Sequence, residues 1–228
     1  MEADRPRWLT LIGFWAAGLI AGIATCISIR WLALVVGDNL FYFLGAVFGI
    51  FLSLYLWLFH QQRSVIRVLI FTAVSAAAYY AAFCAGVSAI SGELSIHIPL
   101  LGIDPQEVPI MIVGGLAGAF IVFLAFYFLF ARIESRTRIL AKLGIAVLSS
   151  AVLGVVGWAL WSSVGSAVWT LLLILRLGSP REAVLQAAPK DTAQSYSLYV
   201  VWQSGFALLL GLLCPLRARP NSSDSAET

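Results

Sequence analysis

The stretch Ile110–Phe130 reads IMIVGGLAGAFIVFLAFYFLF and contains no charged residue. A helix that crosses a bilayer needs about 20 largely apolar residues, because it must span a hydrocarbon core of about 30 Å. Pro109 directly precedes the stretch, and proline suits the first helical turn, where its missing N–H would have no partner anyway. The stretch therefore predicts a membrane-spanning α-helix.

The composition of the whole chain favours the same environment. The sequence has 228 residues, of which 61% are hydrophobic and 11% charged, whereas an average soluble domain has about 25% charged residues. A water-soluble domain of this length could not bury so much apolar surface, and a disordered chain would need low hydrophobicity and high charge. We expect a polytopic integral membrane protein that contacts the lipid bilayer.

Charged or polar residues divide the rest of the chain into further apolar runs. The expected spans cover residues 8–29, 40–59, 68–90, 110–130, 143–161 and 198–216. Together they predict an all-α bundle of six transmembrane helices within a single domain, residues 1–220. The segment 221–228 is short and polar, so we expect a disordered tail there.

The stretch Ile139–Leu175 does not fit one span. As one helix it would be about 55 Å long at 1.5 Å per residue, yet two spans with a turn need roughly 40 residues or more. Its main polar break is a cluster of small residues, Ser162, Ser163, Gly165 and Ser166. We expect the fifth span to end near Trp161 and residues 167–177 to form a short interfacial or re-entrant helix. A seventh span is the alternative.

Lysine and arginine positions predict the orientation, because cytoplasmic loops of membrane proteins carry an excess of both. With the N-terminus inside, ten of the 14 basic residues fall in cytoplasmic segments, namely Arg5, Arg7, Arg63, Arg67, Arg132, Arg136, Arg138, Lys142, Arg217 and Arg219. A seventh span would move the last two outside, against this bias. We therefore expect both termini in the cytoplasm and a location in a bacterial cytoplasmic (inner) membrane.

Few residues inside the spans could carry chemistry. Every acidic residue lies in a loop or at a span end, where it cannot form an intramembrane proton relay. Ser204 is a candidate nucleophile, but the expected topology places both histidines, His60 and His97, too far away to serve as its base. A divalent-cation site in one outer loop is conceivable from Glu93, His97, Asp104 and Glu107, although the prolines there favour a solvated cap. We expect no catalytic site, metal site, cofactor or nucleic-acid partner.

Small residues at helical spacing are the most specific pattern in the sequence. Three Gly-x-x-x-Gly pairs occur, Gly18 with Gly22, Gly45 with Gly49, and Gly114 with Gly118. Helices in lipid gain stability when small residues let their backbones approach closely. We expect these pairs to pack helices within the bundle; the alternative is a contact with a lateral partner helix or with a second copy in a homo-oligomer.

Gln203 is a strongly polar side chain inside the last expected span, about five residues past its start. An amide in an apolar medium must find hydrogen-bonding partners. A structural hydrogen bond to a neighbouring helix is one explanation. The other is that Gln203 lines a polar cavity together with Tyr79, Tyr80 or Ser75.

These patterns leave two classes of function open. The first is a non-enzymatic membrane scaffold, assembly or accessory component that binds partners laterally. The second is a small carrier or channel for an uncharged or lipophilic solute. A tunnel lined by Gln203 would favour the carrier, and a packed interior with an exposed glycine stripe would favour the scaffold.

Overall fold

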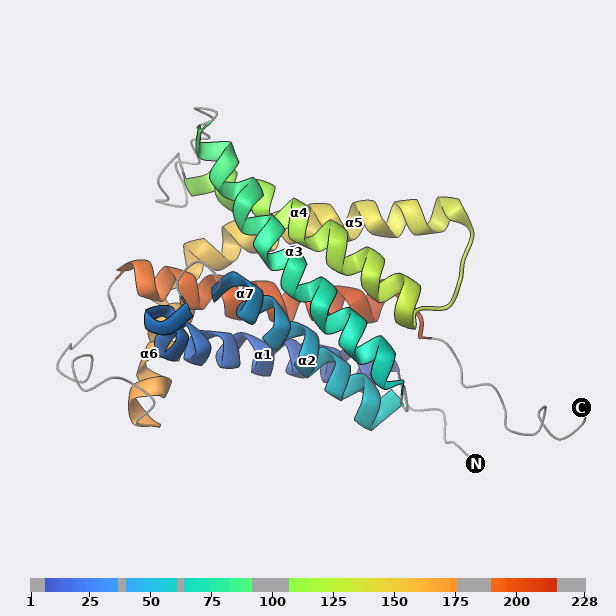
Figure 1. Cartoon of the computed structure of the whole chain (residues 1–228), viewed down its shortest axis with the longest axis horizontal. Coiled ribbons are helices and arrows are strands. Elements are labelled where there is room, and N and C mark those ends of the chain that lie inside the picture. The colour runs from blue at the N-terminus through green and yellow to red at the C-terminus, as the bar shows by residue number, and fades with distance from the viewer. Residues whose placement is uncertain (1–6, 37–39, 61–63, 92–106, 176–189, 217–228) are drawn as a thin grey trace, which may run out of the picture.

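The computed structural model describes residues 7–36, 40–60, 64–91, 107–175 and 190–216, and within them the chain is helical (Figure 1). The helices are α1 (Arg7–Val36), α2 (Leu40–His60), α3 (Val65–Ser91), α4 (Glu107–Phe130), α5 (Arg136–Ala159), α6 (Val164–Ile174) and α7 (Lys190–Leu213). Six of these helices are long and apolar enough to cross a membrane, whereas α6 is too short. The predicted fold class, six long apolar helices and one short one, is confirmed.

Two helices extend further than the sequence suggested. Helix α1 continues past Arg30 to Val36, and the Arg30 guanidinium lies 4.6 Å from the centre of the Trp169 ring. A cation over an aromatic face is stabilised by the ring's electrons, so Arg30 does not end the helix. Helix α7 begins at Lys190 rather than at residue 198. Its first turns are polar but include the buried side chains of Gln194 and Ser197.

The break after the fifth long helix falls where the serine and glycine cluster predicted it. A single 3-10 turn, Leu160–Ser162, follows α5, and α6 then begins at Val164, a few residues earlier than expected. Helix α6 lies at one end of the bundle (Figure 1) and packs against α7. Its buried side chains Val168, Trp169 and Leu172 form a small apolar cluster with Cys26 and Val200.

The six long helices form a closed ring. Helix α1 contacts α2 and α7, α3 contacts α2 and α4, and α5 contacts α4 and α7. Successive long helices run in opposite directions, so the bundle has two ends. We call them the Glu107 end, where α4 and α7 begin, and the Arg136 end, where α1, α3 and α5 begin.

The half of the ring nearest the Arg136 end is filled with aromatic side chains. Phe126 is completely buried, and its ring packs edge-on against the rings of Phe14 and Phe71, each with a centroid separation of 5.9 Å. Phe71 in turn packs edge-on against Phe130 at 5.5 Å. These contacts join three helices, α1, α3 and α4, in one buried apolar cluster.

Polar contacts join the segments at the Arg136 end. The backbone N–H of Arg132 donates to the carbonyl of Pro215 at 2.8 Å, and that of Glu134 donates to the Tyr127 hydroxyl at 2.7 Å. The Lys142 ammonium lies 2.7 Å from the Glu134 carboxylate.

Candidate functional site

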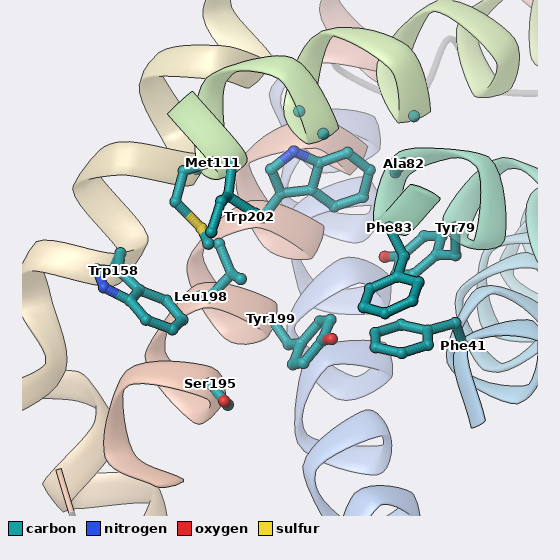
Figure 2. Close-up of a pocket in the computed structure, with 15 residues that line it drawn as sticks. Phe41, Tyr79, Ala82, Phe83, Met111, Trp158, Ser195, Leu198, Tyr199 and Trp202 are labelled. Carbon is teal, nitrogen blue, oxygen red and sulfur yellow. The ribbon is translucent and has the colours of Figure 1, made fainter. Parts of the chain in front are cut away.

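A cavity of about 320 Å³ lies in the half of the ring nearest the Glu107 end (Figure 2). Five helices contribute to its wall, α2, α3, α4, α5 and α7. The lining residues are Phe41, Tyr79, Ala82, Phe83, Ile110, Met111, Gly114, Gly115, Gly118, Gly154, Trp158, Ser195, Leu198, Tyr199 and Trp202. None of them carries a charged side chain, so the cavity suits an uncharged occupant.

Small residues on facing helices create this space. A Cβ atom on Gly114 would lie 3.0 Å from the Ala82 carbonyl oxygen, and one on Gly154 would lie 3.0 Å from that of Met111. The helix backbones therefore touch at these glycines, which have no side chains to fill the volume beside the contact. Helix α4 supplies Phe126 to the aromatic half of the ring. At the cavity, it supplies three glycines and the side chains of Ile110 and Met111.

Aromatic rings form the walls and the floor of the cavity. Phe41 and Phe83 are stacked at one wall, with ring centroids 3.9 Å apart. The Trp202 indole meets the Tyr79 ring edge-on at 5.4 Å and stacks on Phe206 at 4.9 Å. Trp202 thus separates the cavity from the aromatic core below it.

Hydrogen bonds fix the position of the Trp202 ring. Its indole N–H donates to the Ser150 hydroxyl at 2.6 Å, and that hydroxyl donates to the Gly115 carbonyl at 3.1 Å. This chain of bonds connects α7, α5 and α4 at one level of the bundle. Near the Glu107 end, the Trp158 indole N–H donates to the Glu107 carboxylate at 2.8 Å, which joins α5 to the first turn of α4.

Gln203 lies behind the cavity wall rather than in it. The residue is completely buried near the middle of α7, about 20 Å along the helix from Lys190 at 1.5 Å per residue. This is deeper than expected, because α7 begins earlier than the sequence suggested. Its amide N–H donates to the Thr25 hydroxyl at 3.0 Å, and that hydroxyl lies 3.4 Å from the amide oxygen.

The residues expected to accompany Gln203 separate in the structure. Tyr79 lines the cavity, whereas Tyr80 and Ser75 do not. The Tyr80 ring stacks on Tyr42 at 4.4 Å, and Ser75 packs close to Gly45 and Gly49. Sequence reasoning missed the aromatic lining, although the tyrosine beside Gln203, Tyr199, lies in the same helix and contributes to it.

All six glycines of the three pairs pack against helices of the same chain. Gly18 and Gly22 face α7, and a Cβ atom on Gly22 would lie 2.7 Å from the Val200 Cα. Gly45 and Gly49 face α3, with Thr72 Cα at 2.7 Å from a Cβ on Gly49. Gly114 and Gly118 face Ala82 of α3, and both also line the cavity.

Other glycines make equally close contacts without the four-residue spacing. Gly154 and Gly157 are three residues apart on α5, and they contact α4 at Met111 and α7 at Leu198. Gly165 of α6 packs directly on the backbone of Ala193. A search for Gly-x-x-x-Gly alone overlooks these positions, although a glycine in an apolar helix is itself a signal of close approach.

The described residues do not bring together the serine and histidine considered for catalysis. The Ser204 hydroxyl donates to the Val200 carbonyl of its own helix at 2.6 Å, and the His60 Nε2 is paired with the Tyr55 hydroxyl at 3.0 Å, near the Arg136 end. In the described part of the chain, no three metal-ligating side chains converge. Glu93, His97 and Asp104 lie outside the described residues.

The fold and the apolar surface define the class of this protein. Aliphatic and aromatic side chains such as Leu58, Ile66 and Phe128 are largely exposed on the outside of the ring, where lipid can contact them. With six helices of sufficient length and hydropathy, the chain has the architecture of a multi-pass α-helical membrane protein. No family model, curated protein or solved structure matches it.

Proposed function

We propose that this protein is a small carrier that binds an uncharged, lipophilic solute in the cavity near the Glu107 end. The observation that supports this proposal is the cavity itself, an aromatic-walled space of about 320 Å³ inside a ring of membrane-spanning helices. Ligand sites in proteins are typically apolar hollows of about 300–1,000 Å³ with a few placed polar groups. A charged solute would lose its hydration without a described charged partner in the lining.

Photolabelling tests the proposed binding. We would reconstitute the protein in phosphatidylcholine vesicles and use trifluoromethyl phenyl diazirine, a neutral apolar photolabel, with peptide mass spectrometry to locate the label. Labelling of cavity peptides should saturate with label concentration, because the site has a fixed volume, whereas labelling of the lipid-facing surface should rise linearly.

A pair of matched variants completes this test. Leu198→Trp places a larger side chain in the cavity and should abolish the saturable component. Leu58→Trp makes the same change at a side chain that is 70% exposed on the outside of α2. This variant should leave the saturable component of labelling unchanged. Purely linear labelling of the wild-type cavity peptides would contradict the proposal.

A scaffold or accessory role is the second candidate, and a different surface favours it. The small residues Ala73, Ala77, Cys84 and Ser88 of α3 are exposed on one side of the bundle, where a partner helix could approach closely. The three glycine pairs are already used inside the chain, so they do not provide this surface. Oxidative cross-linking through Cys84 in membranes should trap a homo-oligomer or a partner if this role is correct, and Cys84→Ser should prevent it.

We further propose that the Arg136 end faces the cytoplasm of a bacterium, with the protein in the inner membrane. Six described basic residues, Arg7, Arg67, Arg132, Arg136, Arg138 and Lys142, belong to this end, against Arg30 and Lys190 near the other. Such an excess of lysine and arginine is typical of the cytoplasmic side.

Cysteine accessibility tests the orientation at two positions outside the described residues, Ser222 and Gln106. In intact cells, an impermeant maleimide should label Gln106→Cys and leave Ser222→Cys unlabelled. The native cysteines would first be replaced by serine. The reverse labelling pattern would contradict the proposed orientation.

A further inference from the structure

The Tyr79 hydroxyl is a polar group in the cavity region that lacks a hydrogen bond. Tyr79 is 7% exposed, lines the cavity, and has no hydrogen-bond partner for its hydroxyl oxygen. The Gln203 side chain is close enough to interact with this hydroxyl, but the amide forms its hydrogen bonds with Thr25. A buried polar group without a hydrogen bond is destabilising. A ligand atom in the cavity that bonds to the Tyr79 hydroxyl would remove this cost.

A second tyrosine belongs to the same cavity lining. Tyr199 also lines the cavity, and the two tyrosines are near enough to interact electrostatically. In Figure 2 the Tyr199 hydroxyl points toward the Phe41 ring, and the Tyr79 hydroxyl lies beside the Phe83 side chain. The cavity therefore combines a polar spot, formed by two phenol groups, with a surrounding apolar wall.

The chemistry of the two phenol groups selects the kind of polar atom that fits between them. Each tyrosine hydroxyl has one hydrogen to donate, and a carbonyl oxygen has two lone pairs to accept both. A carboxylate would also accept two hydrogen bonds, but it would be buried with no positive side chain among the described lining residues.

We propose that the solute is a neutral lipophilic carbonyl compound, such as a quinone, ketone or ester, whose oxygen accepts hydrogen bonds from Tyr79 and Tyr199. Its apolar part lies against Phe41, Phe83 and Trp202. This inference rests on the carrier function proposed above and specifies the chemistry that the site recognises.

Competition between two probes of the same shape tests the inference. Duroquinone and durene share a tetramethylated six-membered ring, and only duroquinone has carbonyl oxygens. Each would compete against the diazirine photolabel in the reconstituted wild-type protein, with all concentrations expressed per mole of lipid so that different partitioning cancels. Duroquinone should displace the label from the cavity peptides at a concentration about 30-fold lower than durene does, which corresponds to two net hydrogen bonds of about 1 kcal/mol each.

Three variants connect this preference to the two hydroxyl groups. Tyr79→Phe and Tyr199→Phe remove one hydroxyl each and keep the ring, so each should weaken displacement by duroquinone about fivefold and leave durene unchanged. The double variant should bind both probes equally. Tyr42→Phe is the control, because Tyr42 is exposed and does not line the cavity.

The possible outcomes separate the two proposals. If the label saturates but duroquinone displaces it no better than durene, the carbonyl inference is overturned and the binding of lipophiles stands. If the label does not saturate in the wild type, the carrier proposal fails and the inference fails with it. The ratio for the two probes in the wild type decides the inference even if a tyrosine variant does not fold.

Discussion

The two halves of the helix ring are built on the same helices but differ in what fills them. Toward the Arg136 end, α4 contributes Phe126 and Phe130, which pack among the rings of Phe14 and Phe71. Toward the Glu107 end, α4 contributes Gly114 and glycines at neighbouring turns, and a cavity of about 320 Å³ remains. Close backbone contacts of α4 with α3 at Gly114 and with α5 at Gly154 continue beside the cavity.

The comparison shows that close backbone contact and a filled interior are separate properties. Glycine lets two helix backbones approach closely, but it has no side chain to fill the space beside that contact. Aromatic side chains do the opposite, because each fills a large volume. The Trp202 ring, which is hydrogen-bonded to Ser150, lies at the boundary between the aromatic core and the cavity.

Truncating one aromatic side chain in each half should give the largest difference. Phe126→Ala removes a completely buried ring with three aromatic neighbours and should lower the free energy of unfolding by about 3–5 kcal/mol. Phe83→Ala removes a ring that is 38% exposed beside the existing cavity and should cost only about 1 kcal/mol. Reversible unfolding by dodecyl sulfate in mixed micelles measures both, and equal losses would show that the two halves are packed alike.

Overpacking the glycine contacts should have the next largest effect. Gly18→Leu, Gly45→Leu and Gly118→Leu should each destabilise the bundle by about 1–3 kcal/mol. The effect of Gly118→Leu should be the smallest, because its nearest neighbour is the Ala82 Cβ at 3.2 Å and the cavity lies beside it.

Gly144→Leu is the matched control for these substitutions, because nothing lies within 4 Å of a Cβ atom at Gly144. We expect its stability in the same unfolding assay to match that of the wild type. If all four variants were as stable as the wild type, the close contacts at Gly18, Gly45 and Gly118 would have no energetic importance.

The smallest effect is expected for Gln203. A double-mutant cycle with Gln203→Leu and Thr25→Val should give a coupling energy of about 0.6 kcal/mol, the average for hydrogen bonds between membrane helices. Gln203→Leu should also leave saturable photolabelling intact, since the residue does not line the cavity. Loss of saturable labelling with unchanged stability would instead show that Gln203 takes part in binding.

The number of long helices and the position of the short one could be predicted from the sequence alone. Both depend on local properties, namely the length of an apolar run and the place where small polar residues interrupt it. The run Ile110–Phe130 and the break at Ser162 and Ser163 therefore gave correct helices without knowledge of any neighbour.

Helices α1 and α7 extend beyond the expected spans 8–29 and 198–216, and contacts with distant residues accompany both extensions. Arg30 remains within α1 because α6 brings the Trp169 ring beneath its guanidinium. The polar first turns of α7 are helical, with Gln194 and Ser197 buried against neighbouring helices. Neither contact can be inferred from residues adjacent in the chain.

The sequence by itself determined an all-α membrane bundle and identified the small residues that let its helices approach. Only the tertiary structure decided what lies between those helices. Thr25 and Gln203 are 178 positions apart and become hydrogen-bonded partners, and the cavity receives residues from five helices. A local apolar run fixes a helix because the backbone bonds within itself, but a hollow depends on side-chain volumes that meet only when the ring closes.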